Sequence, residues 1–316
     1  MCRKGASPQH FKAMHSFFFP NKNKIFKPKR YETMIDFPCA KINLGLNVVE
    51  RRPDGYHNLQ TVFFPIAIYD ALEIKTMDER FPSDVPCDLK VSGNGICCNE
   101  TDNLVVKAYN IVAADYDIPR VHAHLYKNIP SEAGLGGGSS DAAFMIRLLD
   151  QRFRINIGNA AMEAYAARLG ADCPFFITAE PSYAEGIGEK LSPVNITDNN
   201  LAGYTLVVVK PQIAVSTREA FSLITPKMPE YCCRDVVAQP VDKWRDMLSN
   251  DFEKSVFTLY PQLSDIKSRL YNMGASYAQM SGSGSSIFGL FKTDVDKKVI
   301  EDTFGGCRTF VTRIKG

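Results

Sequence analysis

A glycine-rich stretch is the strongest chemical signal in the sequence. Glycine lets the backbone approach a ligand closely, and the free N–H groups of such a loop and of a following helix attract phosphate oxygens. The serines after the glycines add hydroxyl groups that cap a helix or contact phosphate. We therefore predict a phosphate-binding loop rather than a flexible linker or an ordinary helix cap. It consists of Pro130, Ser131, Glu132, Ala133, Gly134, Leu135, Gly136, Gly137, Gly138, Ser139 and Ser140.

Two common nucleotide-binding motifs do not describe this loop. The P-loop ends in Gly-Lys-Ser/Thr, and no lysine follows the glycines here. The dinucleotide-binding fingerprint needs a last glycine where this sequence has Ser139. The loop therefore predicts phosphate chemistry of another kind.

Taken together with the loop, three other stretches resemble the GHMP kinases, the superfamily of galactokinase, homoserine kinase, mevalonate kinase and phosphomevalonate kinase. The resemblance extends from about Ile35 to the end of the chain. It implies an ATP-dependent kinase of a small molecule, with Mg²⁺ accompanying ATP and with metal ligands that the sequence does not identify. The stretches are Ala40 to Leu46 with Asp54 to Thr61, Leu169 to Phe176 with Ala184 to Glu189, and Met280 to Ser286.

The resemblance implies that Lys41 and Asp172 are the catalytic pair. Phosphorylation of a hydroxyl needs a carboxylate that accepts or orients its proton and a cation that offsets charge on the transferred group. Asp172 would be the base, and Lys41 would keep it ionised and contact the acceptor or the γ-phosphate. Without the resemblance, Lys41 reads as an exposed strand residue and Asp172 as a turn residue.

The resemblance also implies an acceptor site. Within the family, the Asp54-Gly55-Tyr56-His57 stretch is typical of members that act on a cytidyl diphosphate sugar alcohol in isoprenoid precursor biosynthesis. An aromatic ring beside an imidazole suits a pyrimidine base. Tyr183 would supply the second stacking ring, although relatives usually have Phe there. The expected acceptor-binding residues are Asn43, Tyr56, His57, Tyr183, Ser281, Gly282, Ser283 and Gly284.

Asn103 and Lys127 match family positions near the adenine and ribose of ATP, although helix capping and a solvated strand end are the alternatives.

Two residues depart from the family pattern. Glu132 brings a negative charge into the loop unless it points to solvent, and Asp141 stands where some members have Asn. Both leave the affinity for ATP open.

The elements that would position these residues alternate between strands and helices. Apolar and β-branched runs predict strands at 40–49 and 61–68, joined by a turn at Arg52 to Gly55, and helical spacing predicts helices at 104–114, 141–153 and 160–169. Further strands are expected at 87–91, 121–126, 206–209, 277–280, 287–291 and 308–312, with helices at 263–271 and 295–304. The fold class is α+β.

The resemblance implies two domains, a ribosomal-S5-like one that binds ATP at 34–195 and a ferredoxin-like one at 196–316. Residues 1–33 carry eight basic residues against one acidic residue. We expect a basic, disordered N-terminal extension, with an organelle-targeting segment or a nucleic-acid arm as alternatives.

Composition narrows the class of protein. The formal net charge is +2, and residues 1–33 carry +7, so the rest of the chain carries −5. Because that part is mildly acidic, it argues against nucleic acid as a partner. No apolar run has the length of a membrane helix. Nine cysteines without a C-x-x-C pattern favour reduced thiols. We expect a cytoplasmic monomer or homodimer with a small-molecule substrate and no membrane partner.

Two rival functions remain open: another GHMP kinase of the homoserine or mevalonate type, and a catalytically silent ligand sensor. The Asp54 to His57 stretch argues against the first, and Lys41 with Asp172 argues against the second.

His122 and His124 share one face of a strand but lack a third metal ligand nearby, so we expect an exposed face. Cys173 and Trp244 are expected to pack in the core.

Overall fold

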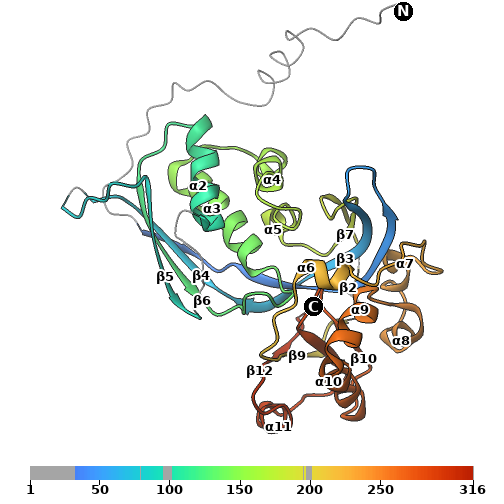
Figure 1. Ribbon diagram of the computed structural model, residues 1–316. Coiled ribbons are helices and arrows are strands. Elements are labelled where there is room, and N and C mark those ends of the chain that lie inside the picture. Colours follow the sequence, from blue (N-terminus) through green and yellow to red (C-terminus); the bar gives the residue numbers. More distant parts are fainter. Residues whose placement is uncertain (1–32, 79, 95–101, 195, 197–200, 316) are drawn as a thin grey trace, which may run out of the picture.

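The computed structural model describes residues 33–78, 80–94, 102–194, 196 and 201–315. Figure 1 shows its layers, with helices above one sheet and a second group of strands and helices below and beside it. The predicted N-terminal extension lies outside the described residues except for Thr33. The predicted domain boundary at 195 and 196 falls where residues 195 and 197–200 are not described, so it stays a prediction.

A long antiparallel hairpin runs through the middle of the molecule. Its sheet has the order β2-β3-β7-β8, and the turn after β2 closes with a hydrogen bond from the Gly55 N–H to the Arg52 carbonyl at 3.1 Å. Alternate side chains of β2 point to opposite faces of the strand. Ile42 and Leu44 pack into a hydrophobic core on one face, and Lys41 and Asn43 line a hollow on the other. The strands are β2 (Cys39–Arg51), β3 (His57–Tyr69), β7 (Ser182–Glu185) and β8 (Lys190–Pro193).

A second sheet carries helices on one face (Figure 1), and its order is β1-β4-β6-β5 with only β5 and β6 parallel. Sequence periodicity missed β1 and β4, which are short. The strands are β1 (Thr33–Asp36), β4 (Ala71–Thr76), β5 (Cys87–Gly93) and β6 (Val121–Lys127). The helices are α2 (Leu104–Asp115), α3 (Gly137–Phe153), α4 (Asn159–Ala167) and α5 (Phe175–Thr178).

The third sheet confirms the ferredoxin-like expectation. It is antiparallel with the order β10-β11-β9-β12, and its main elements follow each other as β-α-β-β-α-β. They are β9 (Thr205–Lys210), α10 (Pro261–Asn272), β10 (Tyr277–Met280), β11 (Ile287–Phe291), α11 (Lys297–Thr303) and β12 (Arg308–Arg313). Shorter helices between β9 and α10 are α6 (Thr217–Phe221), α7 (Cys233–Val236), α8 (Trp244–Met247) and α9 (Phe252–Leu259), with a 3₁₀ turn at Val241–Lys243.

Most predicted elements are present within a few residues of their expected bounds. The clearest difference is α3, which begins at Gly137 and not at Asp141, so the last glycines of the loop form its first turn. Trp244 and Cys173 are fully buried, as expected. Among the described residues, no helix has both the length and the apolar character needed to span a bilayer.

Candidate active site

Two neighbouring hollows meet at the glycine-rich loop. The first lies between the β2–β3 hairpin and α6, and its cavity of about 520 Å³ has the size of a small-molecule site. The second follows the loop itself, from Asn103 and Lys127 to Ser139. In the described part of the chain, only Gly134 and Gly136 line both hollows. A ligand in one hollow can therefore meet a ligand in the other across glycine backbone.

Lys41 and Asp172 face each other in the first hollow. The Lys41 ammonium lies 3.4 Å from the Asp172 carboxylate and donates a hydrogen bond to Asn43 Oδ1 at 2.6 Å. Lys41 is buried, whereas the Asp172 side chain keeps 37% of its surface exposed. A fixed cation therefore stands beside a carboxylate that a substrate can reach.

A chain of hydrogen bonds fixes the lysine from behind. Asn43 donates through Nδ2 to Thr61 Oγ1 at 2.9 Å, and Thr61 donates to the Gly45 carbonyl at 2.5 Å. Gly45 has a φ of +70° at a register shift between β2 and β3. The resulting bulge turns its carbonyl toward Thr61 and explains the glycine. The side chains of Asn43 and Thr61 are buried and fully engaged, so they orient Lys41.

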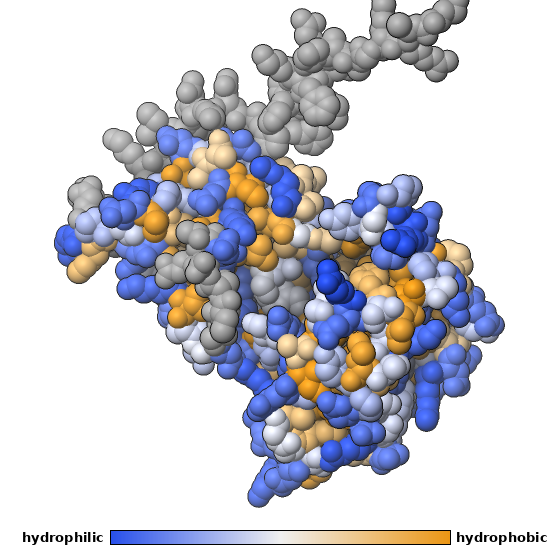
Figure 2. Space-filling model, viewed as in Figure 1, coloured by the Kyte–Doolittle hydropathy of each residue, from blue (hydrophilic) through white to orange (hydrophobic). Residues whose placement is uncertain are grey.

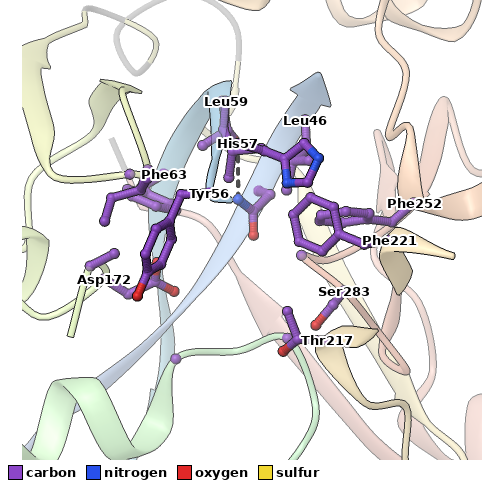
Figure 3. Close-up of a pocket in the computed structure, with 18 of the residues that line it drawn as sticks. Leu46, Tyr56, His57, Leu59, Phe63, Asp172, Thr217, Phe221, Phe252 and Ser283 are labelled. Atoms are coloured by element: carbon purple, nitrogen blue, oxygen red, sulfur yellow. Dashed lines mark hydrogen bonds between the residues drawn. The ribbon is translucent and has the colours of Figure 1, made fainter. Parts of the chain in front are cut away.

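Aromatic groups form the other end of the first hollow (Figure 3). His57 and Phe221 stack with ring centroids 4.6 Å apart and an interplanar angle of 26°, and Phe252 meets Phe221 edge-on. Tyr56 stands across the hollow on the side of Asp172 and is 61% exposed. Burial and the nearby Arg51 lower the pKa of His57, which favours the neutral imidazole at pH 7. Tyr56 and Phe221 both line the hollow.

The structure corrects the prediction for Tyr183. Its ring is buried and packs on the opposite face of the sheet, because it pairs with Val62 and not with the residues that face the hollow. The Arg234 guanidinium covers the ring at 4.8 Å. Phe221, which sequence reasoning missed, lines the hollow instead. No local pattern marks Phe221, because its role depends on where α6 docks.

The glycine-rich loop is held against the Ser281 loop. Ser281 donates through Oγ to the Gly134 carbonyl at 2.8 Å, and the Ser286 N–H donates to the Ala133 carbonyl at 3.3 Å. Gly134 has a φ of +71°, and a Cβ there would collide with the Ser281 carbonyl. At the other end of the loop, no side chain caps the N-terminus of α3. Its first N–H groups are therefore available to an anion.

Lys127 lies beneath this loop in a buried ion cluster. Its ammonium donates to Asp141 at 2.6 Å and, over a very short contact, to Asp70. Asp70 also accepts the N–H groups of Asn128 at 2.5 Å and Ile129 at 2.7 Å. All three charged side chains are at most 2% exposed, so the alternative of a solvated strand end for Lys127 is wrong. The cluster fixes the strand end that leads into the loop.

Two family models match the chain. One is described as GHMP kinases N terminal domain and covers residues 103–180, and the other as GHMP kinases C terminal and covers residues 234–305. A 4-diphosphocytidyl-2-C-methyl-D-erythritol kinase of Bacteroides fragilis is 50% identical over 89% of this chain and over its own full length. One from Solidesulfovibrio magneticus is 40% identical over 83% of this chain and 89% of its own.

The chain belongs to the GHMP kinase family. A solved structure of 4-(cytidine 5'-diphospho)-2C-methyl-D-erythritol kinase superposes on this GHMP kinase with a TM-score of 0.72 and 28% identity, covering 90% of this chain and all of the other. Homoserine kinase from Cytophaga hutchinsonii, at 14% identity and a TM-score of 0.62, covers 92% of this chain and 98% of its own and shares the fold. The α+β two-domain architecture expected from the sequence is therefore confirmed.

The remaining predicted residues of the kinase fall into two groups. Gly282 and Ser283 line the first hollow, whereas Gly284 hydrogen-bonds back to Ser281 within its own loop. Asn103 caps α2 by accepting from the Val105 N–H at 2.9 Å, and it also lines the second hollow. Glu132 is exposed, in agreement with the expectation that it points to solvent.

The two histidines have polar partners on other segments of the chain. His122 contacts Asp88 at 2.8 Å and the Phe81 carbonyl at 3.1 Å, while His124 contacts Ser92 at 2.9 Å. No group of three or more potential His, Cys, Asp or Glu ligands occurs in the described part of the chain. His124 is exposed as expected, whereas His122 is half-buried.

Oxygen donors beside the loop fit a hard cation. Asp141 Oδ1 and Ser140 Oγ are buried without a hydrogen-bond partner, and Asp141 lines the second hollow. Burial raises the pKa of Asp141 well above its usual range, against the lowering effect of Lys127, and the neighbouring Asp70 raises it further. Unpartnered carboxylate and hydroxyl oxygens of this kind are the ligands that Mg²⁺ accepts.

The ion cluster predicts a large stability effect at Asp70. Asp70→Ala would leave two buried N–H groups without an acceptor and one buried lysine with half its counter-charge. We expect the free energy of unfolding to fall by about 3 kcal/mol or more. Urea titration followed by circular dichroism measures it. Asp242→Ala, which removes an exposed partner of Lys292, is the control and should hardly move the midpoint; an equally small effect of Asp70→Ala would contradict the structural role.

Proposed function

We propose that this GHMP kinase transfers the γ-phosphoryl group of ATP to the 2-hydroxyl of 4-diphosphocytidyl-2-C-methyl-D-erythritol, in the non-mevalonate pathway to isoprenoid precursors. The relatives at 40–50% identity carry that name and align over most of their length. The observation that carries the proposal is the first hollow, in which stacking rings at one end and a lysine–carboxylate pair at the other match a cytosine base and an acceptor hydroxyl.

Asp172 is placed to act on the acceptor hydroxyl. Its exposed carboxylate would accept the proton as the hydroxyl oxygen attacks phosphorus. Lys41, fixed by Asn43, would offset negative charge on the transferred group. Because Lys41 is already positioned before substrate arrives, little reorganisation is needed during the reaction.

The second hollow would hold ATP. The N–H groups at the start of α3 would receive phosphate oxygens, and the absence of side chains at Gly136 and Gly138 leaves room for them. Asp141 and Ser140 would hold Mg²⁺, which neutralises phosphate charge when it is bound. The β- and γ-phosphates would then approach Gly134 and Gly136, where the two hollows meet.

ADP release with different acceptors tests the proposal directly. Full-length protein with Mg-ATP is supplied separately with 4-diphosphocytidyl-2-C-methyl-D-erythritol, homoserine and mevalonate. We expect turnover with the first acceptor alone, since only it has a base for the aromatic end of the hollow. Turnover with homoserine or mevalonate alone would favour another GHMP kinase activity. ATP binding without turnover on any acceptor would favour a sensor.

Loss of the proposed base should slow the chemical step. We expect Asp172→Asn to lower kcat at least about a hundredfold, because the amide cannot accept the hydroxyl proton. Steady-state kinetics with both substrates saturating measures this. Asp294→Asn, an exposed carboxylate paired with Arg313, serves as the matched control and should keep its rate. A reduction below about threefold in Asp172→Asn would refute the assignment.

The corrected aromatic site gives a separate prediction. Phe221→Ala removes one face of the proposed base site, so KM for the cytidyl acceptor should rise about tenfold or more while KM for ATP stays constant. Tyr183→Leu, which removes the aromatic ring, is the comparison, and its KM values should stay near those of the unmodified enzyme because Tyr183 lies on the far side of the sheet. If Tyr183→Leu raised the acceptor KM and Phe221→Ala did not, the placement of the base would be wrong.

A further inference from the structure

The acceptor hollow has little positive charge available for its proposed ligand. Among the described residues that line it, the only Lys or Arg side chains are Lys41 and Arg218, and Asp172 is the only carboxylate. The proposed acceptor carries a diphosphate between its cytidine and its sugar alcohol. Buried or half-buried phosphates need charge-assisted partners, so the hollow must supply at least one cation to them.

Lys41 is already committed elsewhere. It is 3% exposed, donates to Asn43 and pairs with Asp172, at the end of the hollow where the acceptor hydroxyl must lie. His57 favours its neutral form, since its pKa is lowered by burial and by Arg51. Neither residue therefore supplies a free positive charge to the middle of the hollow.

Arg218 differs from both. It is exposed and makes no hydrogen bond or ion pair with any other residue that the structure describes. It follows Thr217 on α6, three residues before Phe221, and all three residues line the hollow. In the view of Figure 3, Thr217 and Ser283 are drawn below Phe221.

The short helix that carries Arg218 is firmly held. Ser216 and Glu219 form a reciprocal capping box, and Glu219 also accepts a hydrogen bond from the Tyr260 hydroxyl at 2.6 Å. Phe221 packs edge-on against Phe252 of α9. The backbone of Arg218 is thus fixed, while its guanidinium is free to meet a ligand. Figure 2 shows apolar and polar groups interspersed over the visible face of the molecule.

We infer that Arg218 binds the diphosphate of the acceptor and makes the enzyme selective for diphosphate-linked cytidyl substrates. The inference rests on the proposed function for the identity of the acceptor. A diphosphate that joins a base stacked on Phe221 to a hydroxyl beside Asp172 must cross the hollow, and Arg218 is the cation of its described lining that has no other partner. The planar guanidinium offers paired N–H donors to two phosphate oxygens.

A series of cytidine ligands tests this without requiring catalysis. Isothermal titration of the full chain with cytidine, CMP and CDP should give affinities that rise with each added phosphate. In Arg218→Ala, the increase in affinity from cytidine to CDP should be about tenfold to a hundredfold smaller, while cytidine itself binds as before. Arg218→Lys should recover part of the gain. The KM for 4-diphosphocytidyl-2-C-methyl-D-erythritol should rise by a similar factor, and KM for ATP should not change.

Arg234→Ala is the matched control, because Arg234 is also a partly exposed arginine near this region but covers Tyr183 on the opposite face of the sheet. The Arg234→Ala protein should keep the full increase in affinity from cytidine to CDP. An undiminished gain and an unchanged acceptor KM in Arg218→Ala would overturn the inference and leave the proposed function intact. Conversely, absence of turnover in the unmodified enzyme, together with an Arg218-dependent gain for CDP, would contradict the proposed function and support the diphosphate site. Failure of the unmodified enzyme to bind any cytidine ligand would overturn both.

Discussion

The contact between the glycine-rich loop and the Ser281 loop is the constraint on which the active site depends. Ser281 donates to the Gly134 carbonyl, and its hydroxyl also accepts from the Asn43 N–H at 3.3 Å. The Lys41 N–H in turn donates to the Leu135 carbonyl at 2.9 Å. Three segments that are far apart in sequence are therefore joined within a few ångströms. Gly134 permits this approach, because any side chain there would separate the loops.

The charges of the site are arranged in two separate groups. Lys41 and Asp172 form a pair that a substrate can reach, whereas Lys127, Asp70 and Asp141 form a cluster that is closed to solvent. Two carboxylates share one ammonium in that cluster, which leaves excess negative charge beneath a phosphate site. Partial protonation of Asp141, which its raised pKa favours, or a bound cation would balance that charge. The ammonium of Lys127 is therefore engaged by carboxylates beneath the loop.

Much of this arrangement could be predicted from sequence, because local signals determined it. The glycines before α3, the alternation in β2 and the β-α-β-β-α-β succession each identified an element, and the resemblance supplied the pairing of Lys41 with Asp172. What failed depended on contacts across the fold. Tyr183 was expected to line the hollow, whereas Phe221 does so, because strand parity and helix docking decide which ring faces the hollow. The burial of Lys127 required Asp70, which lies 57 residues earlier in the sequence.

The junction of the two hollows has an evolutionary consequence. Among the described residues, only Gly134 and Gly136 line both hollows, so no described side chain lines both. Substitutions on α6 or at the tip of the β2–β3 hairpin can therefore change the lining of the first hollow without changing a residue of the second. Solved structures named homoserine kinase and mevalonate kinase keep this fold at 14% identity. Because two glycines join the hollows, the sequence of one hollow can diversify while that of the other stays constant.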